Sequence, residues 1–228
     1  REGQMPTVLI TGANRGIGLE LTRQYAAAGW DVIACCRKPK EAAQLARLKV
    51  EMRPLDVAKP ASIAKLAAAL KGRAIDVLLN NAGILGKRSG FGKAESKEFL
   101  SVMQVNALGP LLMAQSFWPH VKRSKMKRIA AITSGMGSIA SGANGGSYAY
   151  RSSKAALNMV MKNLGNDLGG KGILTAAISP GWVKTDMGGK SAPLGVVDSA
   201  AGIIAVIAGL DAKSSGGFFN YNGQILPW

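Results

Sequence analysis

The feature that most constrains this chain is a glycine-rich segment that separates its first apolar run from its first helical pattern. Thr7–Thr11 is a short β-type run, Thr11–Gly18 reads TGANRGIG, and apolar residues at helical spacing follow over Ile17–Ala28. Glycines allow a sharp turn and close approach by a ligand, while a helix N-terminus offers unpaired N–H groups to an anion. This order predicts a site for the pyrophosphate of a dinucleotide in an α/β fold.

The spacing of these glycines narrows the nucleotide class. Gly12, Gly16 and Gly18 follow G-x-x-x-G-x-G, which differs from the commoner G-x-G-x-x-G and lacks the Lys-Ser/Thr ending of a triphosphate-binding loop. The alternative is a glycine turn that only starts a helix. Gly135–Ala140 also matches G-x-G-x-x-A, but no helical pattern follows it directly, so we do not assign it to a nucleotide.

The rest of the chain repeats the alternation of strand and helix patterns. The expected strands are Thr7–Thr11, Asp31–Cys36, Val50–Leu55, Ile75–Asn80, Arg128–Thr133, Ile173–Ser179 and Gly217–Tyr221. The expected helices are Ile17–Ala28, one starting at Pro39, Pro60–Leu70, Lys97–Lys122, Tyr148–Leu168 and Val197–Leu210. Because βα repeats form parallel sheets, the sequence predicts a single-domain, Rossmann-like, doubly wound parallel sheet of about seven strands with helices on both faces. The domain is expected to span residues 6–228, with Arg1–Met5 as a leader.

Composition excludes several functional classes. The chain is 47% hydrophobic and carries 29 Lys and Arg against 13 Asp and Glu, so it should fold, and its net charge of +16 favours anionic partners. The adjacent Cys35 and Cys36 cannot form an ordinary disulfide, and the single histidine, His120, cannot build a multi-histidine metal site. The longest apolar stretch, Ala200–Leu210, has only 11 residues, too few to span a membrane. We expect no metal, no membrane span and a cytoplasmic location.

The end of the second expected strand favours NADP over NAD. NAD-binding folds place a carboxylate about 20 residues beyond the glycine loop to bind the ribose 2′-hydroxyl, whereas this chain has Cys36 and Arg37 there. Arg37, and Arg15 within the glycine loop, can form charge-assisted hydrogen bonds with a 2′-phosphate. The alternative is that both are solvated surface charges. Asp56 can accept from the adenine amino group or can cap a helix or turn.

A tyrosine and a lysine four residues apart form the candidate catalytic pair. Tyr150 and Lys154 lie within an expected helix, where residues at this spacing share a face. A free tyrosine has a pKa of about 10, and a nearby ammonium favours the phenolate, so Lys154 is expected to lower the pKa of Tyr150. Taken alone, Tyr-x-x-x-Lys is a weak pattern, because either tyrosine, Tyr148 or Tyr150, can anchor a buried helix.

Together these segments resemble the short-chain dehydrogenase/reductase family. The resemblance is carried, in chain order, by Thr11–Gly18, Asn80-Asn81-Ala82-Gly83, Asn106, Ser134, Tyr150, Lys154, Pro180-Gly181 and Val183-Lys184-Thr185. It covers nearly the whole chain from Thr7 onward. The ending Asn222–Trp228 is most similar to the C-factor-like and carbonyl-reductase-like branch.

The resemblance implies an NADP(H)-dependent oxidoreductase that transfers a hydride between the nicotinamide and a small or medium carbonyl or alcohol. It implies that Tyr150 donates or accepts the proton and that Lys154 also binds the nicotinamide ribose. Ser134 would polarise the substrate oxygen, and Asn106 would support a proton-relay water. With the residues argued above, the cofactor-binding set is Gly12, Asn14, Arg15, Gly16, Ile17, Gly18, Arg37, Asp56, Val57, Asn81, Ala82, Gly83, Tyr150, Lys154, Pro180, Gly181, Val183 and Thr185.

Two serines compete for the catalytic role. Ser134 lies 16 residues before Tyr150, a longer separation than the family commonly shows, and Ser138 lies 12 residues before it. Ser134 is preferred because it directly follows the expected strand. The substrate pocket is expected among the loops Gly83–Gly92, Met136–Gly146 and Trp182–Leu194, with Met136, Trp182, Met187 and Trp228 as apolar lining or as ordinary packing residues.

Two other functions stay open. The resemblance to C-factor-like members permits a signalling or regulatory protein that binds NADP with little turnover. The net charge and the cluster His120, Lys122, Arg123, Lys125, Lys127 and Arg128 permit a binder of nucleic acid or another polyanion. That cluster has no interleaved aromatic residues and lies at an expected helix C-terminus, where cations are favourable, so nucleic acid is the less favoured partner. The family resemblance also implies a homodimer or homotetramer through the two long helices.

Overall fold

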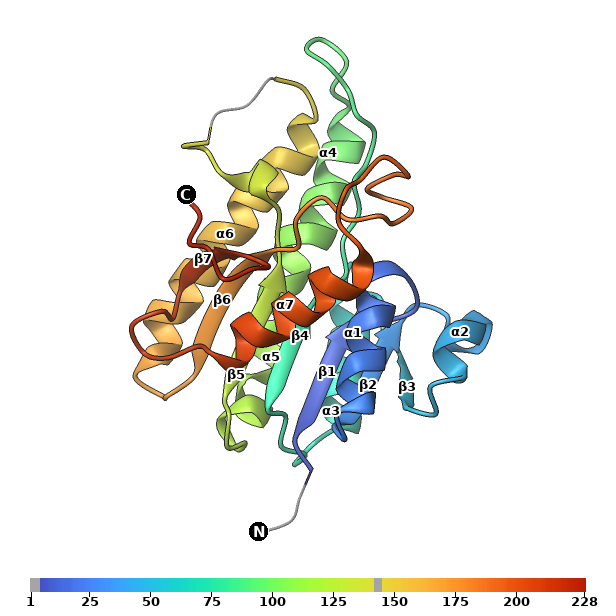
Figure 1. Ribbon diagram of the computed structural model, residues 1–228, viewed down its shortest axis with the longest axis vertical. Helices are drawn as coiled ribbons and strands as arrows, with labels where there is room; N and C mark the ends of the chain where they lie inside the picture. The colour runs from blue at the N-terminus through green and yellow to red at the C-terminus, as the bar shows by residue number, and fades with distance from the viewer. Residues whose placement is uncertain (1–4, 142–144) are drawn as a thin grey trace.

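The sheet has seven strands, all parallel, in the order β3-β2-β1-β4-β5-β6-β7. The computed structural model describes residues 5–141 and 145–228, and Figure 1 shows helices packed on both faces of the sheet. The strands are β1 (Thr7–Thr11), β2 (Asp31–Cys36), β3 (Glu51–Pro54), β4 (Val77–Asn80), β5 (Arg128–Ile132), β6 (Leu174–Ser179) and β7 (Gly217–Asn220). The expected fold class is confirmed. Residues 1–4 of the expected leader and residues 142–144 of the expected pocket loop Met136–Gly146 lie outside the described residues.

The alternation of side chains along each strand supplies two separate apolar layers. Leu9 and Ile33 point into one layer, which α3 (Pro60–Ala69), α5 (Gly109–Lys122) and α6 (Tyr148–Gly169) cover. Val8 and Ile10 point into the other, which α1 (Gly16–Ala27), α2 (Ala43–Ala46) and α7 (Val196–Ala208) cover. Burial on both faces explains why these strands are continuous apolar runs.

The strand order reverses between β1 and β4. The chain runs outward from β1 through β2 to β3 and then returns to β4 on the other side of β1. In doubly wound sheets, ligands bind in the crevice beyond the carboxyl ends of the strands at such a reversal. The glycine loop follows β1, and Asn81-Ala82-Gly83 follows β4. The topology therefore brings these two motifs to the same crevice.

Two expected helices differ from the structure. The helix expected from Pro39 is a 3₁₀ turn, Pro39–Glu41, followed by the four-residue α2. The helix expected over Lys97–Lys122 is divided into α4 (Ser96–Met103), a π-helical segment (Gln104–Leu108) and α5. Pro110 has no N–H to donate to the carbonyl four residues earlier, that of Asn106, so a regular α-helix cannot continue through this point without loss of a hydrogen bond.

No helix among residues 5–141 and 145–228 is both long enough and apolar enough to span a membrane.

Candidate active site

The glycine loop is packed too tightly to accept side chains. A Cβ on Gly12 would lie 2.9 Å from the Ala82 Cα, and a Cβ on Gly18 would lie 2.2 Å from the Gly12 carbonyl oxygen. Gly12 and Gly16 also have positive φ values of 67° and 53°, which favour glycine. The turn therefore excludes side chains at Gly12 and Gly18, and it leads into the N-terminus of α1, which fits the phosphate group that the sequence predicts there.

Asn81 joins the glycine loop to the end of β4. Its side-chain Nδ2 donates to the Thr11 and Gly12 carbonyl oxygens, at 2.9 and 3.1 Å. The Asn81 and Ala82 N–H groups both donate to the Thr11 hydroxyl at 3.0 Å. Asn80, buried beside it, has no hydrogen-bond partner for either side-chain amide atom within the part of the chain that the structure describes. The Asn81 side chain therefore holds the glycine loop in place through hydrogen bonds. Ala82 lies against Gly12 of the same loop.

The predicted catalytic residues meet beside Gly83. Tyr150 and Lys154 lie on one face of α6, are 8% and 4% exposed, and have the Lys154 Nζ 5.6 Å from the centre of the Tyr150 ring. The Lys154 ammonium donates to the Ile132 carbonyl oxygen at 2.9 Å, at the end of β5. A Cβ on Gly83 would lie 3.3 Å from the Asn106 Oδ1 and 3.6 Å from the Lys154 Nζ. Helix α6, the end of β5, the π-helical segment and the loop after β4 therefore lie close together around Gly83.

Burial dominates the titration of both members of the pair. It raises the pKa of Tyr150 above its ordinary value, and a hydrogen bond from Ser134 opposes that shift. Burial also lowers the pKa of Lys154 to about 8. These shifts correct the expectation that Lys154 brings the pKa of Tyr150 below its ordinary value, because a buried phenolate loses its hydration. Near pH 7, Tyr150 is a neutral phenol that can donate a proton.

The two candidate serines have different surroundings. Ser134 lies two residues after the end of β5, its side chain acts to lower the pKa of Tyr150, and it accepts from the Met136 N–H at 3.1 Å. Ser138 donates instead to the Pro227 carbonyl oxygen at 2.7 Å and is 5% exposed. Only Ser134 is therefore positioned to act together with the Tyr150 hydroxyl.

Asn106 lies in the π-helical segment and is fully buried. Its side-chain oxygen accepts from the Ile84 N–H at 2.9 Å, and its Nδ2 donates to the Ile84 carbonyl and to the Ser153 hydroxyl at 2.8 and 3.0 Å. The side chain is therefore committed to fixing the loop after β4. The main-chain carbonyl of Asn106 lacks its usual α-helical donor, because residue 110 is a proline.

The loop after β6 approaches the glycine loop from the other side. A Cβ on Gly16 would lie 3.5 Å from the Thr185 methyl group, and the Arg15 guanidinium is 3.4 Å from the Asp186 carboxylate. Val183 is buried, and the Pro180 carbonyl accepts from the Ser199 hydroxyl at 2.7 Å. Gly181 has a φ of +79°, and a Cβ there would lie 2.8 Å from the Leu194 side chain.

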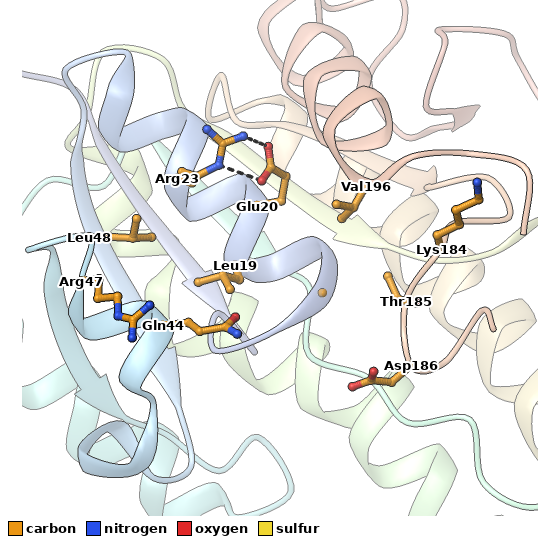
Figure 2. A pocket seen from close by; sticks show the side chains of 11 residues that line it. Leu19, Glu20, Arg23, Gln44, Arg47, Leu48, Lys184, Thr185, Asp186 and Val196 are labelled. Carbon is orange, nitrogen blue, oxygen red and sulfur yellow. Dashed lines mark hydrogen bonds and ion pairs between the residues drawn. The ribbon is translucent and has the colours of Figure 1, made fainter. Parts of the chain in front are cut away.

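A surface pocket of about 490 Å³ lies beside the start of α1. Figure 2 shows Leu19, Glu20 and Arg23 on α1, with Gln44, Arg47 and Leu48 on one side and Lys184, Thr185, Asp186 and Val196 on the other. The pocket reaches Gly16 but includes neither Tyr150 nor Ser134. It therefore adjoins the phosphate end of the predicted cofactor site and not the candidate catalytic group.

The residues predicted to hold the adenosine end lie beyond β2 and β3. Arg37 is exposed and has no ion-pair partner within residues 5–141 and 145–228. Asp56 Oδ1 accepts from the Ala58 N–H at 3.1 Å, which is the turn-forming role that the sequence left open. Val57 is buried, and a Cβ on Gly109 would lie 3.2 Å from its Cβ. Within the glycine loop, Asn14 is exposed, whereas Ile17 is half-buried and packs on α7's layer.

The residues expected to line an apolar pocket lie in different surroundings. Trp182 is exposed and its indole N–H donates to the Gly188 carbonyl at 2.8 Å, so the loop after β6 is closed on itself. Met136 is half-buried, and Met187 is exposed. Trp228 stacks on Phe218, with ring centres 5.4 Å apart. Trp228 is thus a packing residue.

The basic cluster at the end of α5 lies beside an aromatic residue, Trp118, of the same helix. The ammonium groups of Lys122 and Lys171 lie 6.0 and 5.9 Å from the centre of the Trp118 ring. Trp118 precedes the cluster in the sequence, so these contacts place an aromatic ring at the edge of the cluster and not among its members. His120 is buried, and burial lowers its pKa. Part of the cluster is therefore packed against the protein, which supports its interpretation as a cap at the helix C-terminus.

Comparison with known proteins gives consistent matches. Residues 6–193 match the family described as short chain dehydrogenase. The curated C-signal protein of Myxococcus xanthus is 44% identical over 154 residues, which cover 68% of this chain and 93% of that protein. The carbonyl reductase Sniffer of D. melanogaster has a TM-score of 0.91 at 36% identity, covering 99% of this chain and 100% of that chain. The structure of an NADPH-bound carbonyl reductase from chicken fatty liver has a TM-score of 0.93 at 36% identity, with the same coverage.

These matches confirm the resemblance seen in the sequence, including its C-factor-like and carbonyl-reductase-like branch. The matched residues include the glycine loop, the segment after β4, and the helix that carries Tyr150 and Lys154. The chain belongs to the short-chain dehydrogenase family.

Proposed function

We propose that this protein is an NADP(H)-dependent reductase of small or medium carbonyl compounds, with Tyr150 as the proton donor. The observation that carries the proposal is the buried Tyr150, which lies beside the Lys154 ammonium and whose pKa is affected by the Ser134 side chain. A phenol whose pKa is raised holds its proton near pH 7, so it is suited to donate that proton to a developing alkoxide. This property favours carbonyl reduction over alcohol oxidation near neutrality.

Each side chain has a separate task in this proposal. Bound NADPH supplies the hydride, and the chain supplies the proton and the orientation. Ser134 holds the carbonyl oxygen against the Tyr150 hydroxyl, and the Lys154 ammonium binds the nicotinamide ribose hydroxyls. The Asn106 carbonyl, to which Pro110 cannot donate, holds a water through which the proton of Tyr150 is replaced from solvent.

Two arginines support NADP as the cofactor. Arg37 is exposed beyond β2 and available for a 2′-phosphate, and no carboxylate directly follows β2 to bind a 2′-hydroxyl. Arg15 must exchange its contact with Asp186 to reach the same phosphate. The NADPH-bound carbonyl reductase from chicken fatty liver, which has the same fold, supports this assignment by analogy.

The test compares Tyr150→Phe with Tyr148→Phe in an NADPH oxidation assay over a panel of aldehydes, ketones and quinones. Tyr148 lies two positions before Tyr150 on the same helix and is 39% exposed, so its variant controls for loss of a phenol from α6. Tyr150→Phe should lower kcat by at least 100-fold and leave the NADPH dissociation constant within about twofold. Retained turnover in Tyr150→Phe, or equal losses in both variants, would contradict the proposal.

Similarity to the C-signal protein supports a regulatory function as the second candidate. Tight NADPH binding with no turnover of any carbonyl in the panel would favour it over the reductase. The intact group of Tyr150, Lys154 and Ser134 favours the enzyme. A steep salt dependence of DNA or RNA binding, without NADPH turnover, would instead support the polyanion binder.

We also propose that the protein assembles as a homo-oligomer through the helices on the α5 and α6 side of the sheet. Leu100, Leu108 and Met159 are large apolar side chains exposed on α4, the π-helical segment and α6. Helices α4 and α6 pack against each other. Sedimentation of the parent and of Met159→Glu tests the proposal, since a monomeric parent would contradict it.

A further inference from the structure

The C-terminal segment Gln224–Trp228 turns back along β7; we call it the C-terminal strap. The Asn220 N–H donates to the Gln224 carbonyl and the Leu226 N–H donates to the Phe218 carbonyl, each at 2.8 Å. The Trp228 ring stacks on Phe218 and lies 5.9 Å from the Lys162 ammonium of α6. The strap is thus anchored to the last strand and to the helix that carries Tyr150.

The end of the strap binds the loop that follows β5, and Figure 1 shows the C-terminus beside this loop. The Ser138 hydroxyl donates to the Pro227 carbonyl at 2.7 Å, and the Ala140 N–H donates to the Trp228 main-chain oxygen at 2.7 Å. The Ser141 N–H donates to the Ser138 hydroxyl at 3.1 Å. One buried hydroxyl therefore links two segments that are 89 residues apart in the sequence.

Two short hydrogen-bonded turns connect Ser138, which binds the strap, to Ser134. The Gly137 N–H donates to the Ser134 carbonyl at 2.9 Å, and the Ser138 N–H donates to the Gly135 carbonyl at 3.0 Å. On the opposite side, the Gly137 carbonyl accepts from the Asn158 side chain of α6 at 3.4 Å. The loop that begins at Ser134 is therefore held between α6 and the strap.

We propose that the C-terminal strap is a positioning device for the active site: Ser138 and Trp228 hold the loop after β5 so that the Ser134 hydroxyl meets Tyr150. Neither residue touches the reacting groups, so both are positioning residues. The proposal rests on the proposed function, in which Ser134 and Tyr150 act on the carbonyl oxygen. It also accounts for Ser138, the second serine that the sequence offers, without a catalytic role.

The variants Ser138→Ala and Trp228→Ala remove the two anchors separately. Ser101→Ala and Ile225→Ala are the matched controls, because Ser101 is exposed on α4 and the Ile225 side chain is 75% exposed within the strap itself. Trp228→Phe keeps an aromatic ring on Phe218, so its kcat/KM should stay close to that of the parent. Displacement of a reacting group by about 1 Å costs up to about 100-fold, so each anchor variant should lose about 10-fold to 100-fold in kcat/KM. The NADPH dissociation constant should stay within about twofold of the parent.

A second readout does not depend on turnover. The ultraviolet absorbance titration of Tyr150 is isolated as the difference between each protein and the same protein carrying Tyr150→Phe. Because the Ser134 hydrogen bond lowers the pKa of Tyr150, a displaced Ser134 should move this titration to higher pH. A role confined to global stability would lower Tm without moving the titration.

Unchanged kcat/KM and an unchanged Tyr150 titration in folded Ser138→Ala would overturn the strap proposal while leaving the proposed function intact. If Trp228→Ala does not fold, Ser138→Ala and Trp228→Phe decide the question. An inactive parent would contradict the proposed function, and the absorbance titration would then decide the strap proposal by itself.

Discussion

Gly137 lies directly against the main chain of Lys154. A Cβ built on Gly137 would lie 2.8 Å from both the carbonyl carbon and the Cβ of Lys154, which is closer than van der Waals contact allows. The absence of a side chain at this one position lets the turn after Ser134 rest on the helix that carries Tyr150. We therefore expect the position of Ser134 relative to Tyr150 to depend on this glycine.

Gly137→Ala should separate the Ser134 loop from α6. The clash is with backbone, which cannot rotate away, so we expect a fall in kcat/KM of about 100-fold or more and a loss of stability of about 1–3 kcal/mol. Steady-state NADPH oxidation and urea denaturation measure the two effects.

Gly135→Ala is the matched control for this change. Gly135 lies two residues earlier in the same turn, and a Cβ there would meet only the Ser179 hydroxyl, at 3.9 Å. Its variant should retain stability within about 0.5 kcal/mol of the parent. Equal effects of the two alanines would show that the contact between Gly137 and Lys154 is not what positions Ser134.

The titration of Lys154 should appear in the pH dependence of the enzyme. Its pKa is lowered to about 8 by burial, so the ammonium is lost as pH rises through that value. If the charged form is required, kcat/KM for carbonyl reduction falls above about pH 8, well below the pH at which Tyr150, with its raised pKa, ionises.

Lys154→Arg keeps a cation at high pH because the guanidinium does not titrate in this range. Its activity is expected to be lower throughout, since the planar group does not fit the ammonium's contact with the Ile132 carbonyl. The descending limb near pH 8 should nevertheless disappear. The same limb in parent and variant would assign it to another group.

Arg37→Asp should weaken NADPH much more than NADH. A charge-assisted contact with the 2′-phosphate contributes about 1.5–3 kcal/mol, so the NADPH dissociation constant should rise about 10-fold to 100-fold. Arg123→Asp makes the same change in net charge at the end of α5, far from the carboxyl ends of the strands, and should alter neither cofactor. A ratio of NADPH to NADH affinity that Arg37→Asp leaves unchanged would remove this residue from the site.

Local patterns were sufficient to predict the sheet and the main catalytic face. The sequence patterns predict all seven strands within two residues at each end. Strands such as β1 and β2 are buried on both faces and are therefore apolar almost throughout, whereas β3 carries Glu51 and Arg53 and is only partly buried. The four-residue spacing of Tyr150 and Lys154 placed both on one face of α6 because helix geometry requires it.

The contacts that the sequence did not predict join residues far apart in the chain. Ser138 meets Pro227 across 89 residues, and Arg15 meets Asp186 across 171. Such pairs depend on strand order and loop direction, which residue patterns do not specify. The π-helical segment was different, since its signal was present: a proline four residues after Asn106 removes the helical donor for that carbonyl.

Lys154 should also cost the fold stability at neutral pH. Its pKa in the folded chain is about 8, against an ordinary value of 10.5. Between these values the unfolded chain binds a proton that the folded chain does not, so the stability of the parent rises as pH increases from about 8 to about 10.5. Below pH 8 the full cost is present, and the shift corresponds to about 3 kcal/mol as an upper bound.

Lys154→Met keeps the length of the side chain and removes the buried charge. At pH 7 it should raise the free energy of unfolding, by up to about 3 kcal/mol less about 1 kcal/mol for the lost hydrogen bond to the Ile132 carbonyl. The gain should shrink toward pH 10, and turnover should be lost at every pH. Lys65→Met, at an exposed position of α3, controls for replacement of a lysine. Urea denaturation at pH 7 and pH 10 measures the difference, and a variant less stable than the parent at both pH values would mean that Lys154 stabilises the fold as well as serving the reaction.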